Sequence, residues 1–438
     1  MELAGKNVVV VGMAKSGTAA VKLLVSHGAK VRPVDSNPHP PVEGLPVLPQ
    51  EESSFAGADL VVVSPGVPAD LPVLVTVRAR GVPVTGELEL AAPYLKGPTI
   101  GITGTNGKTT TTALTGHILR AAGVRCQVGG NIGTPPAAMV ETSREGQWNV
   151  LELSSFQLET IETFRADIAA CLNLTQNHLD RHHTFEQYAN AKARLFETQH
   201  TGDTAILNAD DSVTAALAGR TQARTRWFSG TRPVDGAWLV GDAIYLDGEP
   251  LLDVRELKLR GRHNYENVMA AALLASTAGA RRDAIARAAA TFQPVEHRLE
   301  PVRVVKEVAY YNDSKATSVD ATLKAIGAFP GSLWVILGGY DKGSDYTPLR
   351  EPLRAKAHAA LLIGAAAPKI AAHLGDKSVQ IFHCGTLAAA VDRAYHCAEP
   401  GDTVLLAPAC SSFDQFENYE HRGRVFKELV HALAGGEK

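Results

Sequence analysis

The clearest chemical signal in the chain is a glycine-rich loop between an expected strand and an expected helix. Residues 99–110 read TIGITGTNGKTT, and a helical sequence follows over residues 111–121. Gly104 and Gly107 allow the backbone to turn so that its N–H groups point inward, and the helix N-terminus adds partial positive charge. This order of strand, loop and helix is typical of nucleotide-phosphate binding.

Two side chains of the loop suit that chemistry. Lys108 can reach the β- and γ-phosphates of a nucleotide, and the Thr109 hydroxyl can bind Mg²⁺. The general pattern would place glycine at Ile102, so an ordinary strand–turn–helix junction with a surface lysine is the alternative. The order of elements favours phosphate binding, and the predicted set is Gly104, Thr105, Asn106, Gly107, Lys108, Thr109 and Thr110.

Further acid and histidine side chains follow downstream strands. Glu152 ends a strand expected over residues 148–152 and is a candidate for a Mg²⁺ contact or for polarising water, although strand-end acids are common. His178 lies beside Asp180 at the end of another strand and is a candidate metal ligand or proton carrier. The neighbouring His182 and His183 are expected to be surface loop residues.

Lys192 lies on a helix expected over residues 185–198. Its neighbours at helical spacing are apolar, so its stem is expected to lie along a buried face. The alternative is an ordinary lysine whose stem is buried and whose ammonium reaches water.

Composition limits the class of protein. The 438 residues suffice for two or three domains, and 45% of them are hydrophobic and 20% charged, as in globular proteins. The net charge of −3 gives no basic field for nucleic acid. There is no long apolar run and no signal-peptide pattern, and the five scattered cysteines suit a reducing compartment, so we expect a cytoplasmic protein without membrane insertion.

The first part of the chain alternates strands and helices. A strand over 7–11, a loop over 12–17 and a strand ending at Asp35 form a βαβ unit that lacks one glycine of the dinucleotide pattern. Asp35 could hold a ribose or base, or the glycines could serve packing alone. With a third strand before Ser64, the strand ends would line one crevice, so the ligand candidates are Gly12, Lys15, Ser16, Gly17, Asp35, Ser64, Pro65 and Gly66. Asn131, in a later glycine-rich loop, is either a ligand contact or a turn residue.

The remaining parts predict a small β excursion over 224–253 and a final α/β unit. Asn264 and Asn267 lie one turn apart at the start of a helix and could cap it or hold a base or ribose. The final unit alternates helices with strands over 302–310, 333–338, 360–364, 380–384 and 403–407, which predicts another mostly parallel sheet. Its polar loops, 311–317, 338–343 and 409–416, favour an active-site surface over simple solvated turns.

These motifs resemble, in order and along the whole chain, those of the Mur ligase family of peptidoglycan synthesis. The matching segments are 104–110 (GTNGKTT), 152–157 (ELSSFQ), 177–181 (NHLDR), 261–267 (GRHNYEN), 297–298 (HR), 313–317 (DSKAT) and 408–416 (PACSSFDQF). The resemblance implies an α/β protein of three domains: a Rossmann-like domain over 1–93, a P-loop ATPase domain over 94–298 with a mostly parallel sheet, and a Rossmann-like domain over 299–438. The second and last blocks resemble the branch that adds glutamate.

The resemblance also implies a reaction and site roles. It implies an ATP-dependent amide ligase that joins D-glutamate to UDP-N-acetylmuramoyl-L-alanine through an acyl phosphate, using two Mg²⁺, with the enzyme as a monomer. Mg²⁺ would be held by Thr109, Glu152, His178 and Lys192, the last as a carbamate. ATP would also contact Asn264, Asn267, Arg298 and Asp313; the UDP-substrate would contact Asn131 and the first-domain loops; glutamate would contact Lys315, Thr317, Lys342, Ser412 and Tyr419.

Three positions depart from the family pattern. Thr109 stands where serine is commoner, Tyr419 where phenylalanine is commoner, and residues 340–342 differ around the glutamate-binding lysine. Two alternatives remain: another ligase of the superfamily, such as an L-glutamate-adding or folylpolyglutamate-type enzyme, and a P-loop ATPase switch that does not ligate. The UDP-type first domain argues against the folylpolyglutamate type, and the polar loops of the last unit argue against the switch.

Overall fold

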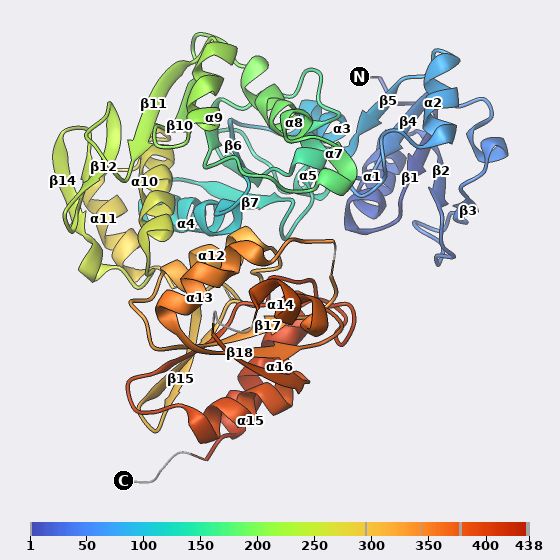
Figure 1. The fold of residues 1–438 in the computed structure, drawn as a ribbon. Helices are drawn as coiled ribbons and strands as arrows, with labels where there is room; N and C mark the ends of the chain where they lie inside the picture. The colour runs from blue at the N-terminus through green and yellow to red at the C-terminus, as the bar shows by residue number, and fades with distance from the viewer. Residues whose placement is uncertain (1, 294–295, 342, 376–378, 435–438) are drawn as a thin grey trace. The chain divides into compact units, whose positions relative to one another are not determined.

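The computed structural model describes residues 2–293, 296–341, 343–375 and 379–434 (Figure 1). The chain forms two compact units, one made of residues 1–257 and 265–292 and the other of residues 258–264 and 293–438. The first unit contains two sheets and the second contains one. Within the described ranges, none of the helices combines the length and the apolar character that a membrane span requires.

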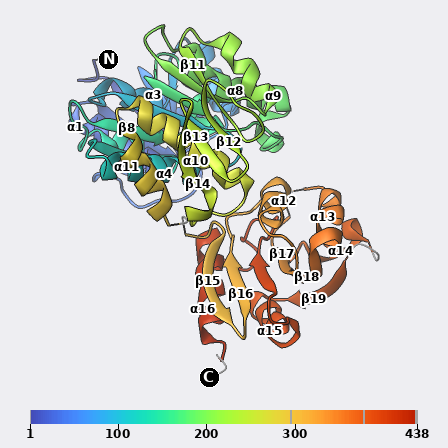
Figure 2. The same ribbon diagram turned by 90° about the vertical axis from the view of Figure 1, so that its left-hand side faces the viewer.

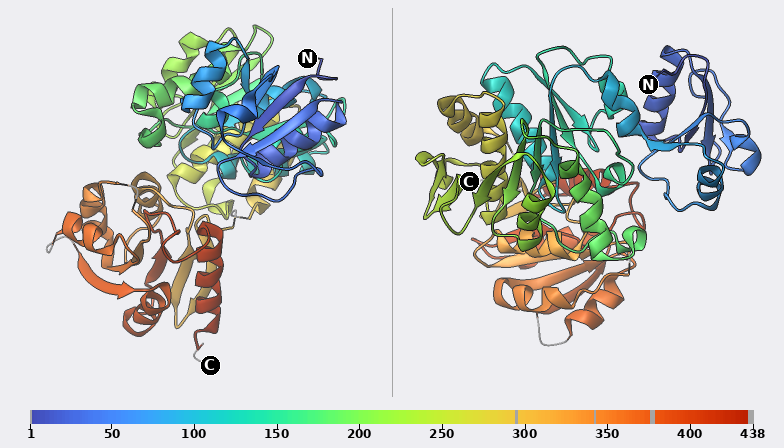
Figure 3. Two further views of the ribbon diagram at one scale, coloured as in Figure 1. Left: turned by 90° about the vertical axis from the view of Figure 1, so that its right-hand side faces the viewer. Right: turned by 90° about the horizontal axis from the view of Figure 1, so that it is seen from above.

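The first sheet, drawn in blue in Figure 3, has five parallel strands in the order β3-β2-β1-β4-β5. Alternate residues of its central strands face opposite sides, so Val8 packs in the cluster of helix α1 (Lys15–Ser26) and Val9 in that of α2 (Pro72–Ala79). Because both faces are covered, the central strands are continuously apolar. The strands are β1 (Asn7–Val11), β2 (Lys30–Asp35), β3 (Leu48–Pro49), β4 (Leu60–Val63) and β5 (Val84–Gly86).

The second sheet has nine strands in the order β14-β13-β12-β11-β10-β9-β6-β8-β7. The strands from β7 to β12 are parallel, and β12, β13 and β14 are antiparallel, which is the β excursion expected from the sequence. The strands are β6 (Thr99–Thr103), β7 (Cys126–Gly130), β8 (Trp148–Glu152), β9 (Ile168–Cys171), β10 (Thr204–Asn208), β11 (Arg224–Ser229), β12 (Gly236–Val240), β13 (Ala243–Leu246) and β14 (Glu249–Asp253).

Helices lie against both faces of this sheet. Leu151 and Leu207 of the sheet share a buried cluster with Phe196 of α8 (Phe185–Glu197). Helix α4 (Lys108–Ala121) contacts β6, β7 and β8, and α11 (Arg282–Thr291) packs on α4. The other helices of this part are α3 (Glu87–Ala91), α5 (Pro136–Met139), α6 (Ser155–Leu158), α7 (Leu179–His182), α9 (Ser212–Ala216) and α10 (Arg262–Thr277).

The second unit has a six-stranded sheet in the order β15-β16-β20-β17-β18-β19. All neighbouring pairs are parallel except β15 and β16. The strands are β15 (Glu300–Val305), β16 (Val308–Asn312), β17 (Leu333–Gly338), β18 (Ala357–Ile363), β19 (Gln380–Gly385) and β20 (Thr403–Leu406).

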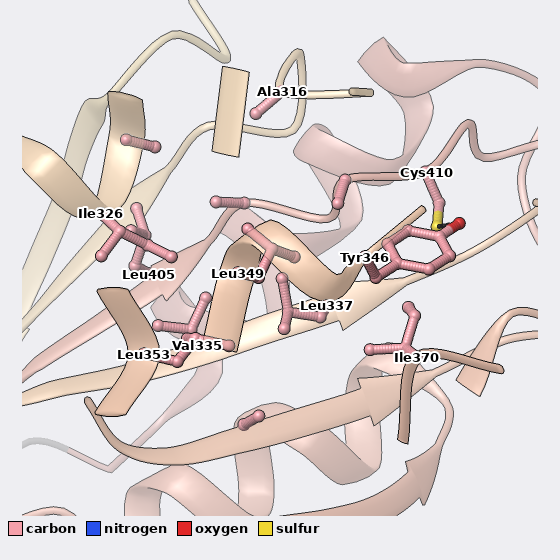
Figure 4. Close-up of a cluster of buried hydrophobic side chains, with 14 of the residues drawn as sticks. Ala316, Ile326, Val335, Leu337, Tyr346, Leu349, Leu353, Ile370, Leu405 and Cys410 are labelled. Carbon is pink, nitrogen blue, oxygen red and sulfur yellow. Dashed lines mark hydrogen bonds between the residues drawn. The ribbon is translucent and has the colours of Figure 1, made fainter. Parts of the chain in front are cut away.

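Two helical layers cover this sheet. Helix α16 (Tyr419–Ala432) lies along β15 and β16 and packs with α15 (Leu387–Cys397) in one buried cluster (Figure 2). The other cluster contains residues of α12 (Val319–Gly327), α13 (Arg350–Lys356) and α14 (Ala367–Leu374) (Figure 4). This is the α/β architecture that the strand–helix alternation predicts.

One predicted strand is wrong. The sequence predicts a single strand over 302–310, whereas the structure has the antiparallel pair β15 and β16. Lys306 and Glu307 join the two strands with φ angles of 51° and 62°. Two consecutive left-handed residues form the tight turn that suits a hairpin, and it usually contains Asn or Gly, so Lys-Glu gave no turn signal.

Candidate functional site

The glycine-rich loop joins β6 to α4 as the sequence predicts. Gly104 and Gly107 have φ angles of 140° and 84°, and Gly107 is the N-cap of α4. A Cβ atom on Gly107 would lie 2.2 Å from Oδ1 of Asn267, so both the turn and the neighbouring helix require glycine here. The Lys108 ammonium donates hydrogen bonds to the carbonyls of Gly104 (2.9 Å) and Thr105 (2.8 Å).

The Glu152 carboxylate connects this loop to a second loop. Its Oε2 accepts a hydrogen bond from the Thr109 hydroxyl at 2.8 Å, and its Oε1 accepts one from the Asn131 amide at 2.8 Å. Only 2% of Glu152 is exposed. A hydroxyl beside a carboxylate fits Mg²⁺, which binds one or two protein ligands and completes its octahedron with phosphate oxygens and water.

The protein ligands by themselves would form an incomplete metal site. Within the described ranges, no group of three or more His, Cys, Asp or Glu side chains could hold a metal ion.

Lys192 is buried with its amine, not only with its stem. The residue is 1% exposed, its Nζ donates to the Thr103 hydroxyl at 3.2 Å, and Nζ lies 4.9 Å from the ring centroid of Tyr188. Burial, and then the nearby Lys108 ammonium, lower the pKa of Lys192 well below its usual value of 10.5. The prediction of a buried face is confirmed, and an ammonium that reaches water is excluded. A neutral amine is a nucleophile.

The histidines differ from one another. His178 is the N-cap of α7 with a left-handed φ of 53°, and His183 is exposed as predicted. The prediction that His182 is a surface residue is wrong, because it is 4% exposed. Its Nε2 lies 2.9 Å from the Ser155 hydroxyl and its Nδ1 lies 3.1 Å from Oε1 of Glu159, so side chains of the preceding helix bury it. The side chain of Asp180 lies outside the described part of the chain.

A pocket of about 490 Å³ lies beside these loops within the first unit. Eight predicted residues line it: Gly12, Lys15, Ser16, Asp35, Ser64, Pro65, Gly66 and Asn131. Met13 and Ala14 also line it and belong to the predicted loop over 12–17, and Gly130 and Gly133 belong to the glycine-rich loop of Asn131. The sequence predicted no ligand contact for the other lining residues, which are Ser36, Gln50, Val67, Pro135 and Gln157. Gly17 is not among the lining residues, because it serves packing: a Cβ there would lie 1.7 Å from the Gly12 carbonyl oxygen.

Asp35 shapes this pocket. Its carboxylate accepts hydrogen bonds from the Met13 amide (2.6 Å) and the Asn37 amide (2.9 Å), and so fixes the loop between β1 and α1. Partial burial raises the pKa of Asp35, but these amide bonds outweigh that effect, so its pKa lies below the usual value of 3.8. The carboxylate is therefore ionised at neutral pH.

The two asparagines near the start of α10 belong to different units. Asn267 accepts a hydrogen bond from the Thr111 hydroxyl of α4 at 3.3 Å and so lies beside the phosphate loop. Asn264 donates to the Arg260 carbonyl at 2.7 Å in the second unit. Both are buried.

In the second unit, Asp313 and Arg298 are candidate nucleotide contacts. Burial raises the pKa of Asp313 to about 6, against the opposing charge of Arg298. The Nε of Arg298 and the Oδ1 of Asp313 are buried and make no hydrogen bond with the described residues. Buried polar atoms of this kind usually need a partner, which a ligand can supply.

Arg422 joins two loops that carry predicted glutamate contacts. Arg422 is fully buried and donates to the carbonyls of Ser314 (2.8 Å) and Cys410 (3.2 Å). On one of these loops, Lys315 places its Nζ 5.5 Å from the ring centroid of Tyr419. Thr317 follows on the same loop, Ser412 lies on the other and is 2% exposed, and Lys342 lies outside the described residues. No local pattern points to Arg422, because a buried arginine in an amphipathic helix resembles a surface one.

The fold and the site define an α/β protein with a P-loop and a neighbouring pocket. Three family models match successive parts of the chain: the Mur ligase MurD-like N-terminal domain over residues 6–86, the Mur ligase middle domain over 102–275, and the Mur ligase glutamate ligase domain over 297–410. The chain belongs to the Mur ligase family.

Curated relatives and solved structures agree with that assignment. The chain is 60% identical over 439 residues to the UDP-N-acetylmuramoylalanine–D-glutamate ligase of Solibacter usitatus (strain Ellin6076), covering 99% of each chain, and 50% identical to the protein of the same name from Acidobacterium capsulatum, covering 99% of this chain and 98% of that one. Its fold is similar to that of the UDP-N-acetylmuramate–alanine ligase MurC from Thermotoga maritima, with a TM-score of 0.64, 20% identity and coverage of 98% and 99%.

Proposed function

We propose that this chain is an ATP-dependent ligase that adds D-glutamate to UDP-N-acetylmuramoyl-L-alanine in peptidoglycan precursor synthesis, with release of ADP and phosphate. The observation that carries the proposal is the 60% identity, over 99% of both chains, to a relative named for this reaction. Glu152 supports it, because one carboxylate contacts both the phosphate loop and Asn131 of the pocket proposed for the UDP-substrate.

The reaction has two steps. A carboxylate oxygen of the L-alanyl group attacks the γ-phosphorus of ATP, the bond to the β-phosphate oxygen breaks, and ADP leaves with an acyl phosphate remaining. The amine of D-glutamate then attacks the acyl carbon, loses a proton, and expels phosphate as the amide forms. Mg²⁺ would neutralise charge where phosphate and carboxylate anions approach each other.

The residues of this chain would contribute positioning and charge. Backbone amides of the loop over 104–110 would hold the phosphates, and Lys108 would leave its two carbonyl partners to contact the β- and γ-phosphates. Thr109 and Glu152 would hold one Mg²⁺. His178, with Lys192 as a carbamate, would hold a second, because a CO₂ adduct converts the buried amine into an anion that can bind metal.

The remaining roles follow the same proposal. Asn264, Asn267, Arg298 and Asp313 would contact ATP, and the unpartnered Nε of Arg298 and Oδ1 of Asp313 support this. Lys315, Thr317, Lys342, Ser412 and Tyr419 would hold the glutamate carboxylates. We further propose three domains with boundaries near residues 93 and 298, a monomer, and a cytoplasmic location, where ATP and the UDP-substrate are made.

One assay tests the proposal. Phosphate release from ATP is measured with UDP-N-acetylmuramoyl-L-alanine and either D-glutamate, L-glutamate, diaminopimelate or no amino acid. The expected result is release that depends on both the UDP-substrate and D-glutamate. Phosphate release that does not depend on the amino acid would identify an ATPase switch. Turnover of L-glutamate equal to that of D-glutamate would identify a different ligase.

A further inference from the structure

The helix that follows His178 cannot hold its own position. Helix α7 spans only Leu179–His182, and left-handed residues flank it, with φ angles of 53° at His178 and 61° at His183. A left-handed non-glycine residue costs about 1–2 kcal/mol. A single helical turn between two such residues therefore depends on contacts from outside it.

One preceding segment supplies those contacts. The Glu159 carboxylate binds the Arg181 guanidinium at 2.8 Å and Nδ1 of His182 at 3.1 Å. The Phe156 ring stands edge-on to His178, with 4.8 Å between ring centroids, and the Arg181 guanidinium lies 5.1 Å from the centre of the same ring. The His178 ring thus packs on Phe156, while its carbonyl oxygen accepts hydrogen bonds from the Arg181 and His182 amides at 3.1 and 2.9 Å.

Arg181 also bonds to the pocket described above. The Nη2 atom that binds Glu159 also donates to the Val67 carbonyl oxygen at 2.9 Å. Val67 lines the 490 Å³ pocket together with the neighbouring loop over 64–66. The Arg181 side chain is only 15% exposed, so this bond lies where water competes weakly.

A small cavity adjoins both the larger pocket and Arg181. The small cavity and the larger pocket share four lining residues, which are Ser64, Pro65, Val67 and Gln157. Arg181 lines the small cavity but not the larger pocket. Its free volume of about 10 Å³ is room for about one water molecule. A displacement of the loop over 64–67 therefore reaches the guanidinium with little space to absorb it.

We propose that Arg181 is a positioning residue that transmits occupancy of the pocket over the 64–67 loop to His178. A ligand that fixes this loop fixes the Val67 carbonyl, which holds Arg181 against Glu159 and Phe156 and selects one orientation of His178. A ligand can shift an equilibrium between two orientations of His178 only if it binds the two states with different affinity. In this proposal the two states differ in whether the Val67 carbonyl holds Arg181. The inference rests on the proposed function in that the ligand used to test it is UDP-N-acetylmuramoyl-L-alanine.

The test measures hydrogen exchange over residues 174–186 of the full chain, without ATP or metal, before and after saturation with UDP-N-acetylmuramoyl-L-alanine. The wild-type protein should show slower exchange when the ligand is bound. Arg181→Met should bind the ligand by calorimetry yet lose this protection, and Arg181→Lys should recover part of it. Mispositioning of His178 should lower kcat by up to about 100-fold, with a smaller change in KM for the UDP-substrate.

Arg194→Met is the matched control. Arg194 is also a half-buried arginine of the first unit that donates to a backbone carbonyl, that of Ile161, and it does not line the pocket. This variant should keep the ligand-induced protection. If Arg181→Met is poorly folded, Glu159→Ala decides the matter, because it removes the ion pair between Arg181 and Glu159 but leaves the Val67 carbonyl available, and it too should abolish the protection.

The outcomes separate this inference from the proposed function. Ligand-induced protection that persists in Arg181→Met, or in Glu159→Ala where that variant decides, overturns the inference. So does a kcat of Arg181→Met equal to that of wild type. Wild-type protein without D-glutamate-dependent phosphate release would instead overturn the proposed function, whatever the exchange data show.

Discussion

The side-chain amide of Asn131 donates a hydrogen bond to Oε1 of Glu152 at 2.8 Å, while Oε2 of the same carboxylate accepts one from Thr109. Asn131 lines the larger pocket and Thr109 belongs to the phosphate loop. The two oxygens of one buried carboxylate therefore hold the two proposed substrate sites in register. Neither contact was evident from the sequence, where Asn131 could equally have been a turn residue.

Replacing Asn131 should disturb catalysis more than nucleotide binding. A hydrogen bond to a charged group contributes about 1.5–3 kcal/mol, so Asn131→Ala should lower kcat/KM for the UDP-substrate about 10- to 150-fold. The KM for ATP should change little, because Thr109 keeps its own bond to Glu152. Steady-state phosphate release measures both constants. Asn190→Ala, which removes a surface amide that pairs with Arg220, is the control and should be neutral.

Lys192 should carry a carbamate. Burial lowers the pKa of Lys192 and so favours the neutral amine, which is the form that adds CO₂, and the product can serve as a metal ligand. Protein exchanged into ¹³C-bicarbonate should show a carbamate carbon signal by NMR that Lys192→Ala lacks. Lys192→Ala should be inactive and should regain activity with a short-chain carboxylate such as acetate or propionate.

A purely structural lysine would behave differently. Burying an uncompensated amine is costly, so Lys192→Met would then raise the melting temperature and leave turnover intact. That result, together with the absence of a ¹³C signal, would exclude the carbamate.

The sequence predicted the parts of this site that depend on local order. The strand, glycine loop and helix around Lys108 and the acid at the end of β8 follow from composition and spacing, since the carboxyl ends of parallel strands meet at one edge. The buried position of Lys192 followed from helical periodicity.

Other features depend on tertiary packing that no local pattern records. His182 is buried because Ser155 and Glu159, more than twenty positions earlier, lie against it. Gln50 and Gln157 line the same pocket from two different parts of the chain. The turn at Lys306 and Glu307 uses left-handed residues without the usual asparagine or glycine.

Glu87 should make the protein less stable as the pH rises. It is 1% exposed, its Oε1 accepts a hydrogen bond from the Ala137 amide, and its Oε2 has no partner among the described residues. Burial raises the pKa of Glu87 from 4.5 to about 7, and the Ala137 amide opposes this. Folding favours the protonated Glu87 carboxyl. Its contribution to the stability of the folded state is therefore complete below pH 4.5 and is lost as the pH rises to about 7.

Glu87→Gln should remove that dependence. The free energy of unfolding of the variant, relative to wild type, should increase by on the order of 3 kcal/mol between pH 4.5 and 7 and then level off. Urea unfolding at several pH values measures it. Glu89→Gln on the same helix is the control and should destabilise, because the Glu89 carboxylate accepts backbone bonds from Glu162, Thr163 and Phe164. Parallel pH curves for Glu87→Gln and wild type would contradict the prediction.

Tyr419 should act through its ring rather than its hydroxyl. The Lys315 Nζ lies 5.5 Å from the ring centroid, and the His297 ring meets the same ring edge-on at 6.3 Å. A cation above an aromatic face gains about 0.5–2 kcal/mol, so Tyr419→Ala should raise KM for D-glutamate about 2- to 30-fold by releasing Lys315. Tyr419→Phe keeps the ring and should behave like wild type.

The second unit contains a matched control for this prediction. Lys306 places its Nζ 3.9 Å from the ring centroid of Tyr395, away from the polar loops, so Tyr395→Ala removes the same kind of contact. It should leave KM for D-glutamate unchanged. If Tyr395→Ala and Tyr419→Ala raised KM for D-glutamate equally, both effects would reflect a general loss of stability. If Tyr419→Phe were as impaired as Tyr419→Ala, the role would belong to the hydroxyl. A rise in KM confined to Tyr419→Ala would establish that the ring orients Lys315 for the carboxylate of the incoming amino acid.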